Sequence, residues 1–340
     1  MLNRRSVPSH TGLRFILVLL VIALLSACGS ASAPPATGAQ TGAQLETPAT
    51  ALPSAAITPG ARLRVLATTT LVGDAVRRVG GDFVDLTVLL PAGSDPHAFV
   101  ASPQDLVALE SAQVVFINGL GLEESLLPAL GKVEQGPVVS VNESVPPLAA
   151  DTHTADDAEE IDAHGSSDPH TWQDVRNVAL WVTTISEALT RLDPANADAY
   201  AQAAAAYRAE LEALHADVAA TIATIPPERR LLVTDHDDLA WFAAAYDMKV
   251  VGAVTPSFSS MASISAQEMA ALQDQIAAQG VPAIFVGATV NPRLANQVAQ
   301  DTGARVIPLY TDSLSAADGP ATTYVQMMRS NAQAIADALR

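Results

Sequence analysis

The sequence predicts an α/β fold with two lobes, each containing a parallel sheet flanked by helices, joined by a long rigid linker helix. Short apolar, β-branched runs alternate with helical patterns over residues 61–193, and the same alternation resumes over residues 226–340. Between them, residues 194–225 form an alanine-rich helical run of about eight turns. A helix of that length can bridge two domains, so we expect the order lobe, linker, lobe.

Residues 1–27 are expected to form a signal peptide. Three arginines precede an apolar run at residues 15–25, which is too short for a comfortable transmembrane span. The stretch Leu-Ser-Ala-Cys that ends at Cys28 matches the lipobox of bacterial lipoproteins, which predicts that Cys28 carries a lipid after cleavage. The alternative is a core cysteine in an uncleaved anchor. Because Cys28 is the only cysteine, no intramolecular disulfide is possible.

Residues 28–60 are predicted to be a flexible tether. They are rich in alanine, proline, threonine, serine, glycine and glutamine, contain one acid, Glu46, and have no hydrophobic period. Removal of residues 1–27, which hold three arginines and no acid, lowers the formal net charge from −18 to −21. Such a charge repels nucleic acid and attracts cations, so we expect no nucleic-acid partner.

The first lobe follows the tether. Its apolar runs predict strands at residues 62–68, 84–90, 114–117 and 138–141. A helical pattern at residues 71–79 ends at a Gly-Gly pair, and a second helix begins at Ser102, which can cap it, with Pro103 at the first helical position. Strand–helix–strand alternation of this kind implies a parallel sheet.

An acidic loop at residues 151–167, containing His153 and His164, precedes the linker region and the second lobe. The loop runs into the tripeptide Asp-Pro-His at residues 168–170 and then into a helix predicted at residues 171–192. In the second lobe, strands are predicted at residues 231–234, 249–254, 283–286 and 305–309, and a closing helix at residues 322–339.

Four polar residues lie beside these predicted elements: His97, His236 and Asp312 follow strands, and His170 precedes a helix. In open α/β folds ligands bind beyond the carboxyl ends of the strands, so the four can converge on a site between the lobes. Each also has a simpler interpretation. A histidine after a strand is often a surface or capping residue, and Asp312 can be a polar turn or a helix cap. Their long separations match no local metal motif.

Several segments in order carry a family resemblance: LLPAGSDPHAFVASPQDL, INGLGLE, SDPHTWQDVRN, VTDHDDLAWFA, IPLYTDSL and TTYVQMMRSN. From about residue 62 to the C-terminus the chain resembles the solute-binding lipoproteins of ABC importers for zinc and manganese. The resemblance implies one metal ion between two lobes, with His97, His170, His236 and Asp312 as its ligands. It also implies a monomeric, exported protein, periplasmic or lipid-anchored to the outer face of the cytoplasmic membrane, whose partners are a membrane permease and an ATPase.

Three parts of the chain depart from this resemblance or fall outside it. The acidic loop is expected to gather metal through His153 and His164, or to be merely a solvated loop. Gly287 and Ala288 stand where relatives commonly place a glutamate, so no role is expected from that position. His215 matches no motif and is expected to be a surface or core residue.

The predicted donor set favours zinc. Three imidazoles and one carboxylate suit Zn²⁺, whereas manganese, the alternative, favours oxygen ligands and higher coordination. The expected function is capture of the ion and its delivery to an ABC permease, with no catalysis. The alternatives are a surface adhesin or metal chaperone, and a zinc-dependent hydrolase, for which four protein ligands leave no open position. Asp95 and Asp168 are expected to turn the chain before proline rather than to orient the imidazoles.

Overall fold

The structure, a computed structural model, describes residues 61–134, 136–148 and 168–340. The predicted signal peptide, Cys28 and tether, and the acidic loop with His153 and His164, lie outside these ranges. Within the described ranges, no helix combines the length and the apolar character needed to cross a bilayer.

The first lobe is built on a four-stranded parallel sheet in the order β2-β1-β3-β4. Its strands are β1 (Leu63–Ala67), β2 (Val84–Val88), β3 (Val114–Ile117) and β4 (Val138–Ser140). Its helices are α1 (Thr70–Gly80), α2 (Pro103–Ser111), α3 (Leu127–Leu130) and α4 (Val175–Leu192). Strand β1 lies inside the sheet with four of its five residues buried, which explains its nearly continuous apolar sequence.

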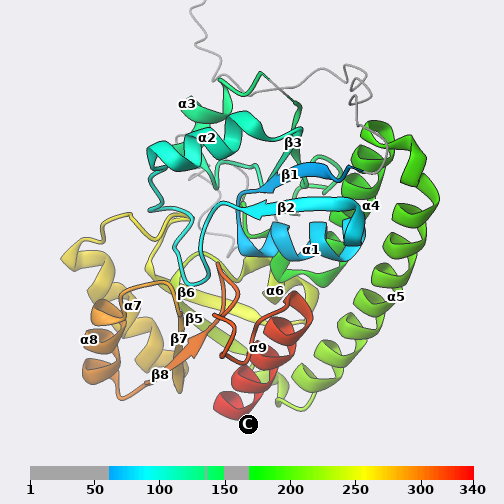
Figure 1. The fold of residues 1–340 in the computed structure, drawn as a ribbon. Coiled ribbons are helices and arrows are strands. Elements are labelled where there is room, and N and C mark those ends of the chain that lie inside the picture. Colours follow the sequence, from blue (N-terminus) through cyan, green and yellow to red (C-terminus); the bar gives the residue numbers. More distant parts are fainter. Residues whose placement is uncertain (1–60, 135, 149–167) are drawn as a thin grey trace, which may run out of the picture. The chain divides into compact units, whose positions relative to one another are not determined.

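The second lobe repeats this arrangement with the order β6-β5-β7-β8 (Figure 1). Its strands, again all parallel, are β5 (Leu231–His236), β6 (Lys249–Thr255), β7 (Ala283–Gly287) and β8 (Arg305–Leu309). Its helices are α6 (Ala240–Ala245), α7 (Ala266–Gln279), α8 (Arg293–Thr302) and α9 (Tyr324–Leu339). The predicted fold class, two lobes with parallel sheets and helical layers, is confirmed.

The predicted long helix is α5 (Ala197–Ile222), drawn in green in Figure 1. It is shorter than the predicted residues 194–225, because Pro194–Asn196 form a 3-10 turn before it. Its buried residues recur every three or four positions: Tyr200, Ala204, Tyr207, Leu211, Leu214, Val218 and Ile222. This stripe packs against α1 and α4 of the first lobe and α9 of the second. The predicted lobe boundaries at residues 193 and 226 remain a prediction.

One cluster of buried apolar side chains extends through both lobes, from Phe116 on β3 through Leu214 on α5 to Phe285 on β7. Smaller clusters lie within each lobe, around Leu109 in the first and Ile284 in the second. The helical layer therefore joins the two sheets into a shared core rather than linking two independent ones.

The helix predicted at residues 171–192 begins later than expected. Thr171–Gln173 form a 3-10 helix, and α4 starts at Val175 after Asp174, whose side chain accepts a hydrogen bond from the main-chain N–H of Arg176. The break gives the chain a separate turn directly after His170, so that this histidine is not carried on α4 itself.

Candidate metal centre

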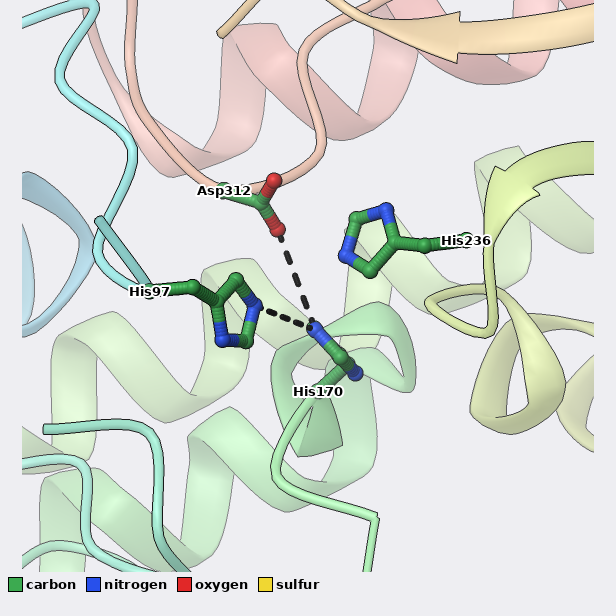
Figure 2. A group of neighbouring side chains, drawn as sticks. All are labelled: His97, His170, His236 and Asp312. Atoms are coloured by element: carbon green, nitrogen blue, oxygen red, sulfur yellow. Dashed lines mark hydrogen bonds and ion pairs between the residues drawn. The ribbon is translucent and has the colours of Figure 1, made fainter. Parts of the chain in front are cut away.

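Three of the four predicted site residues follow strands, at the end where parallel sheets offer a binding crevice. His236 is the last residue of β5, Asp312 lies three residues after β8, and His97 lies on the loop between β2 and α2. His170 directly precedes the 3-10 helix Thr171–Gln173. Figure 2 shows the four side chains pointing toward one another from four separate segments.

One donor atom from each of the four residues lies within 4.8 Å of the other three. The Nε2 atoms of His97 and His170 are 3.3 Å apart, and Asp312 Oδ1 lies 4.0 Å from His170 Nε2. His170 and His236 are fully buried, and His97 is half-buried. The structure thus brings together all four residues, although they are distant in sequence; their role as metal ligands remains a prediction.

The two Asp-Pro-His tripeptides form similar turns. Asp95 Oδ1 accepts a hydrogen bond from the main-chain N–H of His97 at 2.8 Å, and Asp168 Oδ1 accepts the same bond from His170 at 2.9 Å. Both aspartates therefore shape the turn before the histidine, as expected. Asp95 also binds across the lobes, because its Oδ2 accepts a bond from the hydroxyl of Ser260 at 2.6 Å.

Asp168 additionally orients the imidazole of His170. Its Oδ1 atom lies 2.8 Å from His170 Nδ1, so a proton on Nδ1 is held there and Nε2 keeps its lone pair for the centre of the site. The main-chain carbonyl of Asp168 accepts a bond from the indole N–H of Trp241 at 3.3 Å. From the sequence, Asp168 was expected only to turn the chain before Pro169. Its contact with the His170 ring shows that it also orients the imidazole, which corrects that expectation.

Carboxylates surround the outer nitrogen of His236. Its Nδ1 lies 3.3 Å from Asp235 Oδ2 and 3.9 Å from Asp238 Oδ2, while its Nε2 is buried without a hydrogen-bond partner. Burial lowers the pKa of His236, but Asp238, Asp235 and Asp312 outweigh it and raise the pKa well above its usual value. The carboxylates therefore fix Nδ1 as the protonated nitrogen and direct Nε2 toward the other donors.

The two oxygens of Asp312 have different surroundings. Oδ2 lies 3.2 Å from the hydroxyl of Thr289 and 3.3 Å from that of Thr311, both of which donate to it. Oδ1 is buried, has no hydrogen-bond partner and faces His170. The carboxylate thus presents one oxygen to the cluster.

The pKa shifts favour the metal-binding form of two histidines. Burial lowers the pKa of His97 to about 3, with repulsion from the neighbouring imidazoles contributing, and burial holds the pKa of His170 well below its usual value. Both rings are therefore neutral near physiological pH and can offer a nitrogen lone pair. Burial raises the pKa of Asp312 to about 6.

The donor set fits a divalent transition-metal ion. His236 Nε2 and Asp312 Oδ1 are buried polar atoms without partners, an arrangement that costs free energy unless a ligand binds them. Together with His97 and His170 they supply three nitrogens and one oxygen, the number and kind of donors found in tetrahedral zinc sites.

The segment around Asp312 is hydrogen-bonded to the first lobe. The indole N–H of Trp172 donates to the main-chain carbonyl of Thr311 at 2.6 Å. The hydroxyl of Ser313 accepts from the main-chain N–H of Gly93 at 2.9 Å, and Thr70 accepts from the N–H of Leu314 at 2.9 Å. These bonds hold one side of the site closed.

His215 and the pair Gly287 and Ala288 are the other discussed positions that lie among the described residues. His215, which was expected to be a surface or core residue, is half-buried on α5, where its Nδ1 lies 3.2 Å from the hydroxyl of Tyr246. Gly287 and Ala288 carry no donor side chain. A Cβ atom at Gly287 would lie 2.6 Å from the Thr311 hydroxyl oxygen, so glycine leaves room for that hydroxyl.

Sequence reasoning did not single out Asp235 and Asp238, or the hydroxyls of Thr289 and Thr311. A signal for the two aspartates was present, because the run Asp-His-Asp-Asp flanks His236 on both sides. Carboxylates of this kind commonly bind the second nitrogen of metal-binding histidines. No local pattern distinguishes the two threonines, whose contact with Asp312 depends on the packing of β7 against β8.

Comparison with known proteins places these features in a family context. The family model described as zinc-uptake complex component A, periplasmic (ZnuA), matches residues 65–338. Manganese-binding lipoprotein MntA of Halalkalibacterium halodurans is 29% identical over 273 residues, which cover 80% of this chain and 87% of that protein. Iron-binding protein YfeA of Yersinia pestis is 28% identical over 276 residues, with 81% and 86% covered.

Solved structures give the same result. The periplasmic zinc-binding protein TroA of Treponema pallidum superposes with a TM-score of 0.74 at 29% identity, covering 82% of this chain and 99% of that one. A manganese-bound periplasmic metal-binding protein of Candidatus Liberibacter asiaticus gives a TM-score of 0.70 at 27% identity, covering 82% and 100%. Each of these relatives is named as a metal-binding protein and not as an enzyme. With its two-lobe fold and its family match over residues 65–338, the chain belongs to the ZnuA family of extracytoplasmic metal-binding proteins of ABC importers.

Proposed function

We propose that this protein captures one divalent transition-metal ion outside the cytoplasm, zinc in preference to manganese, and delivers it to the permease and ATPase of an ABC importer. The observation that carries the proposal is the convergence of four donor atoms within 4.8 Å, one each from His97, His170, His236 and Asp312. Two of these atoms are buried and lack any other partner.

The preference for zinc follows from the donor chemistry. The relatives' names include manganese, iron and zinc, so relatedness alone leaves the ion open. Imidazole nitrogen suits zinc, whereas manganese prefers more oxygen donors than one carboxylate supplies. Three nitrogens and one oxygen therefore favour zinc.

The location of the protein rests on its N-terminus. We propose that a lipid on Cys28 anchors the mature chain to the outer face of the cytoplasmic membrane, with residues 28–60 as the tether and the folded lobes acting as a monomer. Lipid labelling of the expressed protein and of a Cys28→Ser variant tests the anchor: loss of the label in the variant supports it, and a labelled variant contradicts it.

Metal analysis and titration calorimetry on the purified full chain test the function. We expect one tightly bound zinc ion per chain and weaker binding of manganese. His170→Ala should lose most of the zinc affinity and remain folded, because it removes a fully buried donor at the centre of the cluster. His215→Ala is the matched control and should bind zinc like the parent, since its ring contacts Tyr246 outside the site. Failure of the parent to bind either ion tightly would refute the proposal.

Two further proposals do not follow from the geometry of the site alone. A surface adhesin or metal chaperone using the same four residues is the alternative function; growth in zinc-depleted medium that is unaffected by deletion of the gene would favour it over import.

For the acidic loop, we propose metal gathering by His153 and His164. Deletion of residues 152–165 should slow zinc loading without changing the equilibrium affinity, and unchanged loading would contradict this role.

A further inference from the structure

The carboxylate of Asp312 is held asymmetrically, and this asymmetry bears on the choice of metal. We propose that the hydroxyls of Thr289 and Thr311 restrict Asp312 to binding the ion through Oδ1 alone, and that this restriction disfavours manganese relative to zinc. The inference rests on the proposed function and names the residues that set its metal preference.

The first observation is that the two oxygens of Asp312 have different hydrogen-bond partners. The side chain of Asp312 is fully buried, and Oδ2 accepts hydrogen bonds from both Thr289 and Thr311. Oδ1 has no hydrogen-bond partner and points at the imidazole cluster. An oxygen that already accepts two hydrogen bonds is a weaker metal donor than a bare one, and rotating the carboxylate to use both oxygens would break those bonds.

The second observation is that the threonine side of the carboxylate is closely packed. Gly287 lies behind it, where an added Cβ would stand 2.6 Å from Thr311 Oγ1 and 3.7 Å from Asp312 Oδ2. The main chain of Thr311 is fixed by the indole N–H of Trp172 at 2.6 Å. The Thr311 hydroxyl therefore lies against the main chain of β7, in the space that a side chain at position 287 would need.

The two threonines differ as positions for substitution. Thr311 is next to Asp312 in the chain and its main-chain carbonyl accepts the bond from Trp172, so a change there would disturb the segment that carries the carboxylate. Thr289 faces Asp312 from the start of the β7–α8 connection, with its hydroxyl on Oδ2. At 3.2 Å and 3.3 Å both bonds are longer than the usual hydroxyl–oxygen distance of about 2.7–2.8 Å, so the pair is needed to hold Oδ2. Thr289 is accordingly the better position to test.

The chemistry of the two ions converts this geometry into selectivity. Zinc accepts four donors in a tetrahedron, and one carboxylate oxygen completes such a set here. Manganese prefers oxygen ligands and higher coordination, so a carboxylate that binds through both oxygens favours it. Freeing Oδ2 should therefore weaken the preference for zinc by allowing a fifth protein donor.

The test is a competition titration of zinc and manganese on the purified full chain and on Thr289→Val. Outer contacts of metal ligands typically change affinity by about tenfold or more, so we expect the zinc-to-manganese affinity ratio to fall by about tenfold in the variant. Thr289→Ser keeps the hydroxyl and should retain the parental ratio. Thr183→Val, which removes a half-buried hydroxyl bonded to a carbonyl within α4, is the matched control and should also retain it.

X-ray absorption spectroscopy gives a second readout, and its first part uses the parent protein alone. The zinc-loaded parent should have one carboxylate oxygen at bonding distance, and manganese-loaded Thr289→Val should have one more oxygen than the manganese-loaded parent. Two carboxylate oxygens on zinc in the parent, an unchanged affinity ratio in folded Thr289→Val, or an equal loss of both ions would overturn the inference. Absence of tight binding of either ion to the parent would instead refute the proposed function.

Discussion

Removal of the Asp168 carboxylate should weaken zinc binding although Asp168 is not expected to touch the ion. In Asp168→Ala, His170 loses the acceptor 2.8 Å from Nδ1 that keeps the other nitrogen free for the metal. A hydrogen bond to a charged group contributes about 1.5–3 kcal/mol, which corresponds to a loss of about 10- to 150-fold in affinity if the whole contribution is expressed in binding. The bond from Trp241 should survive, because it uses the main-chain carbonyl.

Competition with a chromophoric zinc chelator at neutral pH measures this loss. Asp301→Ala is the control, because Asp301 is exposed and its side chain contacts two glutamine side chains, Gln273 and Gln297, rather than any residue of the site. Asp95→Ala provides a sharper comparison: Asp95 binds the main chain of its histidine, so its removal should cost less equilibrium affinity than removal of Asp168. A folded Asp168→Ala protein with parental zinc affinity would refute the argument that this carboxylate orients the ring.

Two other changes follow from the contacts and charges at the site. Ser260→Ala removes the 2.6 Å hydrogen bond to Asp95 across the lobes and should speed zinc dissociation by about tenfold. Stopped-flow transfer of zinc to a chelator measures the dissociation rate. An unchanged rate would mean that this bond does not restrain opening of the lobes. Zinc affinity should fall as the pH falls, because zinc competes with protons for His236 and Asp312. The raised pKa of His236 means that zinc binding displaces about one proton from it at neutral pH. Below about pH 6, Asp312 is also protonated, and zinc binding displaces a second proton. Calorimetry in buffers of different ionisation enthalpy counts these protons, and a pH-independent affinity would contradict the assignment.

Much of the fold was predictable because apolar β-branched runs are strong local signals. Strands β3 and β8 occupy the predicted residues 114–117 and 305–309, and α5 lies within its predicted range. Helix starts were less predictable, as at α4, because the turn after His170 is set by tertiary contacts: the ring of Trp172 is buried and bonds to Thr311 in the other lobe.

The site was predictable in part. His97, His236 and Asp312 could be identified as candidates because each follows a predicted strand. Whether such residues meet depends on the order of the strands in the sheet, which no short stretch of sequence specifies. The burial of Asp238 could not be read from its neighbours in sequence, since an acid after a strand usually marks a polar turn. The family resemblance supplied the grouping that residue spacing did not.

Hydrogen bonds tie the segment around Asp312 to the first lobe, so the four donor residues do not divide evenly between the two lobes. By sequence Asp312 belongs to the second lobe, yet Trp172, Gly93 and Thr70 bind its neighbours, so it is mechanically coupled to His97 and His170. His236 instead terminates β5, inside the second sheet. If the four residues hold the ion as proposed, a displacement of that sheet would withdraw the His236 imidazole directly, whereas Asp312 would be restrained by the first lobe as well as by Thr289 of the second. The ion would then keep the two histidines of the first lobe and become open to exchange with an acceptor.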